Sequence, residues 1–95
     1  MKNYNTSIEW LENDVLKLPE VVNVETVPAI LKLVDKAQKS IKVVDFSAVT
    51  QADSVALAVL LKWQDAADID IQIRNLPAEL VTLIHLYDLE SMLQA

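Results

Sequence analysis

Ser54 and His85 are the two side chains from which, together with an Asp, a triad of nucleophile, histidine and acid could be drawn in this sequence. His85 is the only histidine, and the chain has no cysteine. No carboxylate at an obvious ligand spacing also pairs with a second histidine, whereas a metal site needs three or four ligands. A triad of serine, histidine and acid would also need an oxyanion hole and a cleft, and no motif predicts either. We therefore expect no catalytic residue, no metal site and no cofactor, and a small hydrolase is the least favoured function.

Asp53 and Ser54 stand where a polar connection meets a helix, which we predict to run from Ser54 to about Ala67. Asp and Ser are preferred helix caps, and capping is a sufficient reason for both residues. Two further roles are open to Ser54. Its hydroxyl could contact a partner, or it could accept a phosphate, which the free N–H groups and positive dipole end of a helix N-terminus favour.

This predicted helix is apolar on almost every side. Five of its residues can face a sheet, namely Ala56, Val59, Leu60, Trp63 and Ala67. The other apolar residues, Val55, Leu57, Ala58 and Leu61, lie around the remaining surface. A helix of this kind is normally buried, but a chain of 95 residues has no second layer to cover it. We therefore expect part of this surface to bind a partner; alternatively, neighbouring helices hide Leu57 and Leu61.

Composition limits the kinds of partner. The 95 residues predict one domain over positions 1–95, and the formal charge of −6 supplies no basic face for nucleic acid or anionic lipid. The first residues are polar, so we expect no signal peptide. The longest apolar run, Val55 to Leu61, is far shorter than the roughly 20 residues that span a bilayer. We expect a cytoplasmic protein with no direct contact to lipid.

The sequence contains no glycine. This excludes the Gly-rich loops that bind dinucleotides or nucleoside triphosphates. Turns that require a positive φ must then use Asn or Asp, and the candidates are Asn13, Asp14, Asn23 and Asn75.

Hydrophobic periodicity predicts the element order β-β-α-β-α-β-α. A hairpin comes first, with strands at 8–11 and 15–18 whose inward residues are Ile8, Trp10, Leu16 and Leu18. Two strand-helix-strand crossovers follow, so we expect an α/β fold with a mixed, mostly parallel sheet of four strands.

The remaining elements follow from the same periodicity. A helix capped by Thr26 presents Val27, Ile30, Leu31 and Val34 on one side. Ile41–Phe46 reads as a central strand, and Ile69–Arg74 as a half-exposed strand towards an edge. The last helix starts near Pro77, with an inward stripe of Leu80, Leu83, Ile84 and Tyr87.

The stretch from Val43 to Leu57 resembles the signature of the STAS domain family, which includes sulfate transporter tails and anti-sigma-factor antagonists. In that family a central strand ends in Asp-Leu-Ser, and a loop leads to Asp-Ser or Asp-Thr, a small residue, Gly and Leu. Here the corresponding segments are Asp45-Phe46-Ser47 and Asp53-Ser54-Val55-Ala56-Leu57. The resemblance covers nearly the whole chain and implies a STAS-like single domain.

Two departures from the family pattern bear on function. In the antagonist branch the phosphoacceptor lies two positions after the motif Asp, and here that position is Val55, which has no hydroxyl. The usual Gly is Ala56. These differences disfavour a signalling module that binds an anti-sigma factor or kinase and is switched by phosphate, but we keep that function as the alternative.

The sequence is more similar to the Mla branch, the small STAS subunits of phospholipid ABC transporters in Gram-negative inner membranes. It shares with them its size, a hydroxyl residue after the motif Asp, a Leu-rich helix, and a final helix ending in Leu86-Tyr87-Asp88-Leu89. The resemblance implies a non-catalytic subunit that is peripherally associated with the inner membrane and binds the transporter ATPase. It places Ser54 at that contact.

The partner-binding residues that we predict surround the N-terminus and outer side of the helix from Ser54. They are Thr50, Asp53, Ser54, Val55, Leu57, Ala58, Leu61 and Lys62.

Overall fold

Four strands form the main sheet of the computed structural model, which describes residues 7–12 and 14–93. Their spatial order is β1 (Glu9–Glu12), β2 (Val15–Lys17), β4 (Val43–Asp45) and β6 (Gln72–Arg74). β1 runs antiparallel to β2, whereas β2, β4 and β6 are parallel neighbours. The predicted mixed, mostly parallel sheet that begins with a hairpin is confirmed.

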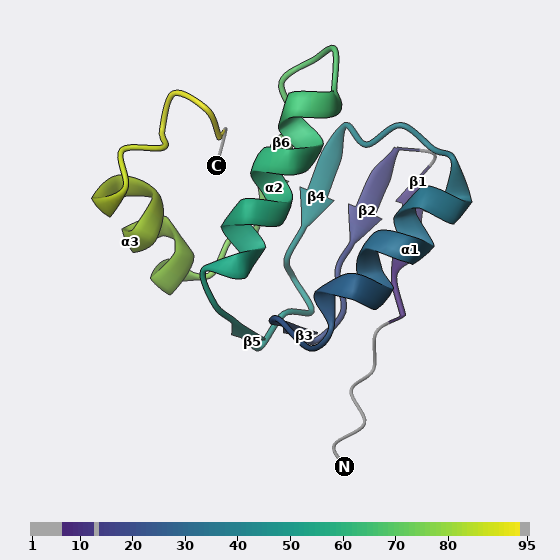
Figure 1. The fold of residues 1–95 in the computed structure, drawn as a ribbon, viewed down its shortest axis with the longest axis horizontal. Coiled ribbons are helices and arrows are strands. Elements are labelled where there is room, and N and C mark those ends of the chain that lie inside the picture. Colours follow the sequence, from purple (N-terminus) through teal and green to yellow (C-terminus); the bar gives the residue numbers. More distant parts are fainter. Residues whose placement is uncertain (1–6, 13, 94–95) are drawn as a thin grey trace.

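The helices are α1 (Val27–Ala37), α2 (Val55–Ala66) and α3 (Ala78–Leu86). Figure 1 shows α1 and α2 side by side over one face of the sheet, with α3 on the other side of α2. The sheet contributes a row across three strands, in which Leu16, Val44 and Ile73 are register partners and at most 8% exposed. This row joins the buried residues of α1 and α2 in one hydrophobic core, where each large apolar side chain stabilises the fold by about 1.5–3 kcal/mol.

A second, two-stranded sheet is formed by β3 (Val21–Val22) and β5 (Gln51–Ala52), which run parallel. Neither segment is predicted as a strand from the sequence, because two residues are too few to show a periodicity. Figure 1 places the pair next to the N-terminal end of α2. These strands therefore fix the segment that leads into Asp53.

Two predicted strands are shorter than expected. The strand predicted at Ile41–Phe46 is β4, with only Val43–Asp45 in the ladder. The strand predicted from Ile69 begins at Gln72, and Ile69 is 49% exposed. The reason is the side chain of Gln64, whose amide donates to the Ile69 carbonyl at 2.8 Å and accepts from the Ile71 N–H at 2.7 Å. A side chain of α2 thus replaces the strand pairing there. β6 nevertheless lies at the edge of the sheet, as predicted.

The end of α3 also differs from the prediction. Tyr87 was placed on the inward stripe, but it is 55% exposed. It is the C-terminal cap of the helix, and Asp88 follows with φ 58°. This left-handed residue redirects the chain, so that Leu93 instead of Tyr87 enters the core at 4% exposure.

Positive φ values occur at Gln38, Asn75 and Asp88 among the described residues. Only Asn75 was predicted, and Asn13 lies outside the described residues. Asp14 and Asn23 do not have a positive φ. Asn23 acts through its side chain, whose Oδ1 accepts from the N–H of Glu25 (2.9 Å) and of Thr26 (3.1 Å) just before α1. Thr26 occupies the N-cap position, as predicted, but its hydroxyl donates to the Val21 carbonyl at 2.9 Å.

The carboxylate of Asp45, at the end of the central strand β4, is the main polar group of the interior. It is 6% exposed. Its Oδ1 accepts from the Ser47 N–H at 3.0 Å and from Asn75 Nδ2 at 2.9 Å, and its Oδ2 accepts from the Ser47 hydroxyl at 2.9 Å. Burial by itself raises the pKa of Asp45, but these hydrogen bonds, with help from the charge of Lys17, outweigh it and hold the pKa below its ordinary value. The group is therefore ionised in the folded protein at neutral pH.

We expect Asp45→Asn to lower the free energy of unfolding by about 1–3 kcal/mol at neutral pH, since the amide cannot accept the same bonds. Because the folded pKa is depressed, the carboxylate stabilises the fold above its unfolded pKa of about 3.9, and this contribution is lost as the pH falls through the folded value. The difference between wild type and variant should thus shrink below about pH 4.

Urea denaturation at a series of pH values from neutral to about pH 2.5 measures this difference. The exposed Asp70 provides a matched control, because Asp70→Asn should change stability by no more than about 0.5 kcal/mol. A gap between wild type and Asp45→Asn that stays constant over the acidic range would contradict the role of the charged carboxylate.

Candidate functional site

The N-terminal end of α2 is held in place by the small β3–β5 sheet. The N–H groups of Thr50 and Gln51 both donate to the Glu20 carbonyl, at 2.8 and 3.2 Å, and the Asp53 N–H donates to the Val22 carbonyl at 3.3 Å. The Thr50 hydroxyl lies 3.3 Å from Glu20 Oε1. This anchoring fixes where Asp53 and Ser54 lie. Glu20 cannot be found from a local sequence pattern, because its partner is 30 positions away along the chain.

Asp53 caps the helix, as predicted. Its Oδ1 accepts from the Val55 N–H at 3.0 Å, and its backbone carbonyl accepts from the Ala56 N–H at 3.0 Å. The expectation that this corner presents free N–H groups was thus wrong for these two positions. A negative ligand here would also lie beside the carboxylate of Asp53, so the corner is poorly suited to an anion.

Ser54 occupies the N-cap position of α2, is exposed and makes no capping bond through its side chain. Among residues 7–12 and 14–93, none forms a hydrogen bond with its hydroxyl. The hydroxyl of Thr50 is engaged with Glu20, as described above, whereas that of Ser54 keeps both its donor and its acceptor capacity for a partner.

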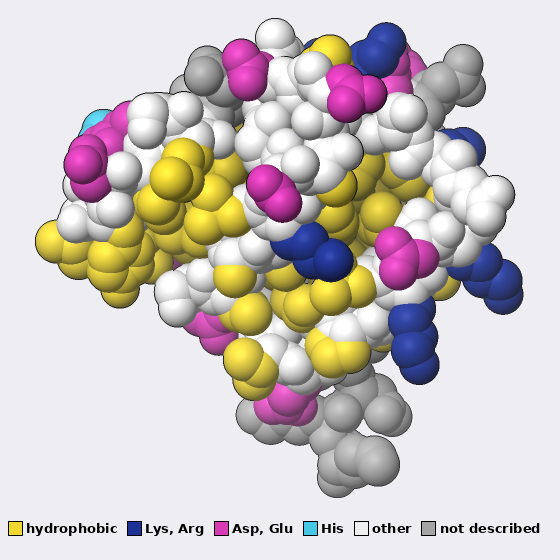
Figure 2. All heavy atoms as spheres, turned by 45° about the horizontal axis from the view of Figure 1, so that its top comes forward, with side chains coloured by type: hydrophobic (Ala, Val, Ile, Leu, Met, Phe, Trp, Pro, Cys, Tyr) yellow, Lys and Arg dark blue, Asp and Glu magenta, His cyan; other side chains and the backbone are white. Residues whose placement is uncertain are grey.

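A continuous strip of accessible residues runs along α2 from this end. Ser54, Ala58 and Lys62 are exposed, while Val55 and Leu61 are half-buried. Residues three and four positions apart share one side of a helix, so these five form what we call the α2 stripe, about 12 Å long. It carries a hydroxyl at one end, an ammonium at the other and apolar atoms between them. Figure 2 shows hydrophobic patches separated by charged side chains over the helix-covered side of the molecule.

Leu57 does not belong to this surface. It was predicted to bind a partner, but it is 3% exposed and lies in the hydrophobic core. Its neighbour Ala56 is also buried. The buried side of α2 is therefore wider than the positions of its few polar residues indicated. The alternative was that neighbouring helices hide Leu57 and Leu61. It is correct for Leu57, which is buried, whereas Leu61 is only half-buried.

His85 is separate from Ser54 in this arrangement. It lies on α3, where its Nδ1 contacts Glu90 Oε1, and both side chains are largely exposed. The backbone N–H of Glu90 and then the His85 ring lower the pKa of Glu90. The groove that His85 lines includes neither Asp53 nor Ser54. Over the described ranges, no cluster of His, Asp or Glu is suited to hold a metal ion, and no helix has the length and apolar character needed to cross a membrane.

The family model described as "Mlab, STAS domain" matches residues 8–94, a range that includes the whole α2 stripe. A search of curated proteins found no match to the chain.

The two residues at the start of α2 should differ in their effect on stability. We expect Asp53→Ala to lower the free energy of unfolding by about 1 kcal/mol, because the Val55 N–H loses its cap. Ser54→Ala should change it by less than about 0.5 kcal/mol, since the hydroxyl makes no bond within the described structure. Denaturant midpoints at constant m-value measure both. A larger loss for Ser54→Ala than for Asp53→Ala would show that Ser54 is the true cap.

Proposed function

The chain belongs to the STAS domain family, in its MlaB type, and we propose that it is the accessory subunit of an ABC-type phospholipid transporter. In this role it performs no catalysis and binds the ATPase subunit on the cytoplasmic side of the inner membrane, through which it is linked to the permease. The transport that it supports maintains the lipid asymmetry of the outer membrane.

The observation that supports this proposal most directly is the α2 stripe. One side of α2 lies in the core. The other side exposes the Ser54 hydroxyl, which has no partner among the described residues, a short apolar strip and Lys62. Such a surface suits a protein partner with a hydrogen-bonding group opposite Ser54, apolar side chains opposite Val55 and Ala58, and a carboxylate opposite Lys62.

The stripe is smaller than a full interface. A stable interface buries about 800 Å² on each partner, and one side of three helical turns supplies only part of this area. Thr50 and Asp53 extend the surface beyond the helix start, and both are exposed. They complete the set of predicted contacts, from which we omit only the buried Leu57.

Binding on its own does not activate an ATPase. It changes the population of the conformation that can dimerise and couple to the permease only as far as the subunit binds this conformation more tightly than the others. A rigid docking surface suits this role, because little of the binding energy is lost in ordering it. The bonds that the Thr50 N–H donates to the Glu20 carbonyl and the Val55 N–H donates to the Asp53 carboxylate provide such rigidity at the start of α2.

The alternative, a signalling module that binds an anti-sigma factor or kinase, rests on the exposed hydroxyl of Ser54. Two features weigh against it. Phosphate on Ser54 would lie next to the Asp53 carboxylate, which repels it. The position at which the antagonist branch carries its phosphoacceptor is Val55.

A substitution at Ser54 tests the proposal. We expect the tagged wild-type chain to recover an ABC ATPase and its permease from gently solubilised membranes of its own source, identified by mass spectrometry. Ser54→Arg should reduce this recovery at least tenfold, because a long charged side chain prevents close approach at the centre of the contact. Its thermal unfolding should stay that of the wild type.

Ser91→Arg is the matched control, since Ser91 is an exposed serine in the segment after α3, and it should leave recovery unchanged. Equal recovery with Ser54→Arg and wild type would refute the proposed interface but not the proposed partner. Recovery of a soluble kinase-like anti-sigma factor in place of the transporter would refute the function itself, and phosphate on Ser54 would then be the next measurement.

A further inference from the structure

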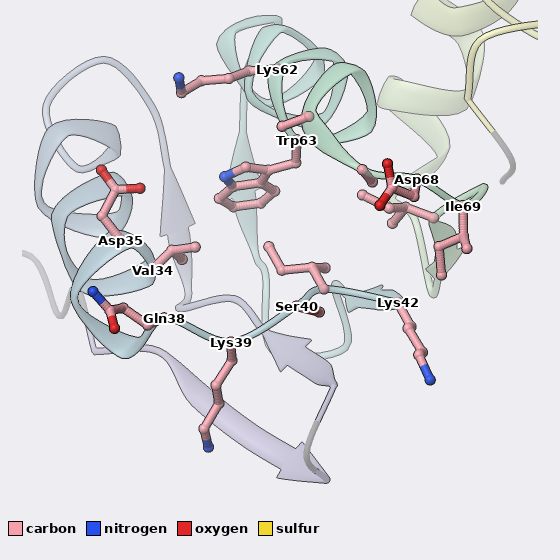
Figure 3. A pocket seen from close by; sticks show the side chains of 14 residues that line it. Val34, Asp35, Gln38, Lys39, Ser40, Lys42, Lys62, Trp63, Asp68 and Ile69 are labelled. Atoms are coloured by element: carbon pink, nitrogen blue, oxygen red, sulfur yellow. The ribbon is translucent and has the colours of Figure 1, made fainter.

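The groove between the C-terminal ends of α1 and α2 (Figure 3) has a volume of about 530 Å³, but the charges along it do not select a ligand. Lys62 stands there against Asp35 and Asp68. A second groove, of about 410 Å³, lies between β6 and α3, and we call it the β6 groove. The backbone of β6 determines what can bind in this second groove.

Largely apolar side chains line the β6 groove. They are Ile73 of β6, Val81 and Ile84 of α3, and Leu93 of the segment after α3, while Glu90 of the same segment adds a carboxylate. The volume is within the range of sites that bind ligands, about 300–1,000 Å³. No residue of the α2 stripe lines this groove, so what binds here does not depend on the proposed transporter function.

The edge of the sheet beside this groove has a free backbone donor and a free acceptor. The Gln72 N–H donates to the Lys42 carbonyl, and the Phe46 N–H donates to the Arg74 carbonyl, both at 2.9 Å. Gln72 and Arg74 thus direct their backbone groups towards β4. Because successive residues of a strand direct their N–H and C=O groups to opposite sides, Ile73 directs both of its groups away from β4, towards the edge.

No described residue pairs with these two groups of Ile73. β6 has β4 as its only neighbour in the sheet, and no turn, loop or side-chain hydrogen bond involves the Ile73 backbone. Two residues earlier on the same edge, the Ile71 N–H is satisfied by Gln64 Oε1 at 2.7 Å. Ile73 is only 8% exposed, and buried backbone groups without a partner cost free energy. A peptide unit in the groove offers both an acceptor and a donor, and it removes this cost.

The charges near the groove favour a basic ligand. Glu90 lines it, whereas no Lys or Arg does. Over residues 75–93, which include α3 and the segment after it, the sequence has three acidic residues and no Lys or Arg. Arg74 directly precedes this range, but its side chain lies on the opposite face of the sheet from Ile73, since successive side chains of a strand alternate.

We infer that the β6 groove binds an extended, basic peptide segment of a partner protein, which adds to the sheet as a strand beside β6. The backbone of this segment accepts from the Ile73 N–H and donates to the Ile73 carbonyl. An apolar side chain packs on Val81 and Ile84, and a Lys or Arg contacts Glu90. In strand addition of this kind, main-chain bonds supply affinity and the contacts of alternate side chains supply specificity.

A second copy of this chain is a poor occupant. The other edge of the sheet is β1, whose Glu9 and Glu12 are exposed and would approach Glu90. Like charges on neighbouring strands are destabilising, so edge-to-edge pairing of two copies is disfavoured.

The test is an NMR titration of the full chain, labelled with nitrogen-15, with the peptide acetyl-Lys-Val-Lys-Val-amide. We expect the amide signal of Ile73 to move downfield to saturation, because its N–H gains an acceptor. The amides of Ser54 and Lys32, which do not line the groove, should stay in place. The same peptide with every peptide nitrogen methylated should bind roughly fivefold more weakly, and acetyl-Glu-Val-Glu-Val-amide roughly threefold more weakly.

Paired variants locate the site. Val81→Arg should weaken binding roughly tenfold or more, because a long side chain fills the groove. Thr82→Arg, at the next residue of α3 and outside the groove, should leave binding unchanged. Glu90→Gln should weaken binding about threefold, whereas Glu25→Gln, at an exposed residue before α1, should not. If Val81→Arg lowers the thermal unfolding temperature, the two glutamate variants decide.

The inference would be overturned if the Ile73 signal showed no saturable movement, or if the methylated peptide bound as tightly as the unmodified one. Movement of the Ile73 signal with protein concentration alone would also overturn it, because the occupant would then be a second copy of the chain.

Discussion

The ionised carboxylate of Asp45 would cost several kcal/mol to bury if hydrogen bonds did not replace the lost water. Its bonds to Ser47 and Asn75 do so, and they also join three parts of the chain: the end of β4, the loop that follows it and the loop before α3. The backbone of the same region continues this connection, since the Leu18 N–H donates to the Asp45 carbonyl and the Phe46 N–H to the Arg74 carbonyl. Across the four strands, Asp45 also belongs to a row of alternating charge, Glu9, Lys17, Asp45 and Arg74. Opposite charges on neighbouring strands support the pairing of the sheet.

The candidate binding surface depends on this arrangement through the loop that leaves Ser47. That loop enters β5, which pairs with β3 and delivers Asp53 to the start of α2. Each of these two strands has only two residues, and the pair would not be stable alone, but the chain continues from it to the main sheet on one side and to a helix on the other. The backbone at Ser54 therefore has a fixed position, although its hydroxyl makes no bond to the described chain. A surface whose polar group is positioned by its neighbours can bind a partner without first being ordered.

A chain without glycine must accept left-handed backbone at ordinary residues, and it does so where the structure turns most sharply. Gln38 ends α1, Asn75 precedes α3, and Asp88 follows it. Asn and Asp tolerate this region better than other residues. At Asn75 the turn also has a second function, because it directs the side-chain amide to Asp45. At Gln38 the turn ends α1, and the Gln38 N–H donates to the Asp35 carbonyl at 3.3 Å.

Much of this structure was determined by the sequence itself. Alternation and helical periodicity specified the hairpin, the three helices and the order of the main strands along the chain. Local capping chemistry identified Asp53 and Thr26 as residues at helix starts. The family followed from a short motif around Asp45 and Asp53, and the family match over residues 8–94 confirms it. Tertiary structure decided the rest, because it depends on groups far apart in the chain. The β3–β5 pairing, the bond from Asn75 to Asp45 and the replacement of a ladder by Gln64 have no local pattern. The burial of Leu57 likewise follows from how much of α2 its neighbours cover, and a helix that is apolar on almost every side does not specify which part of its surface remains outside.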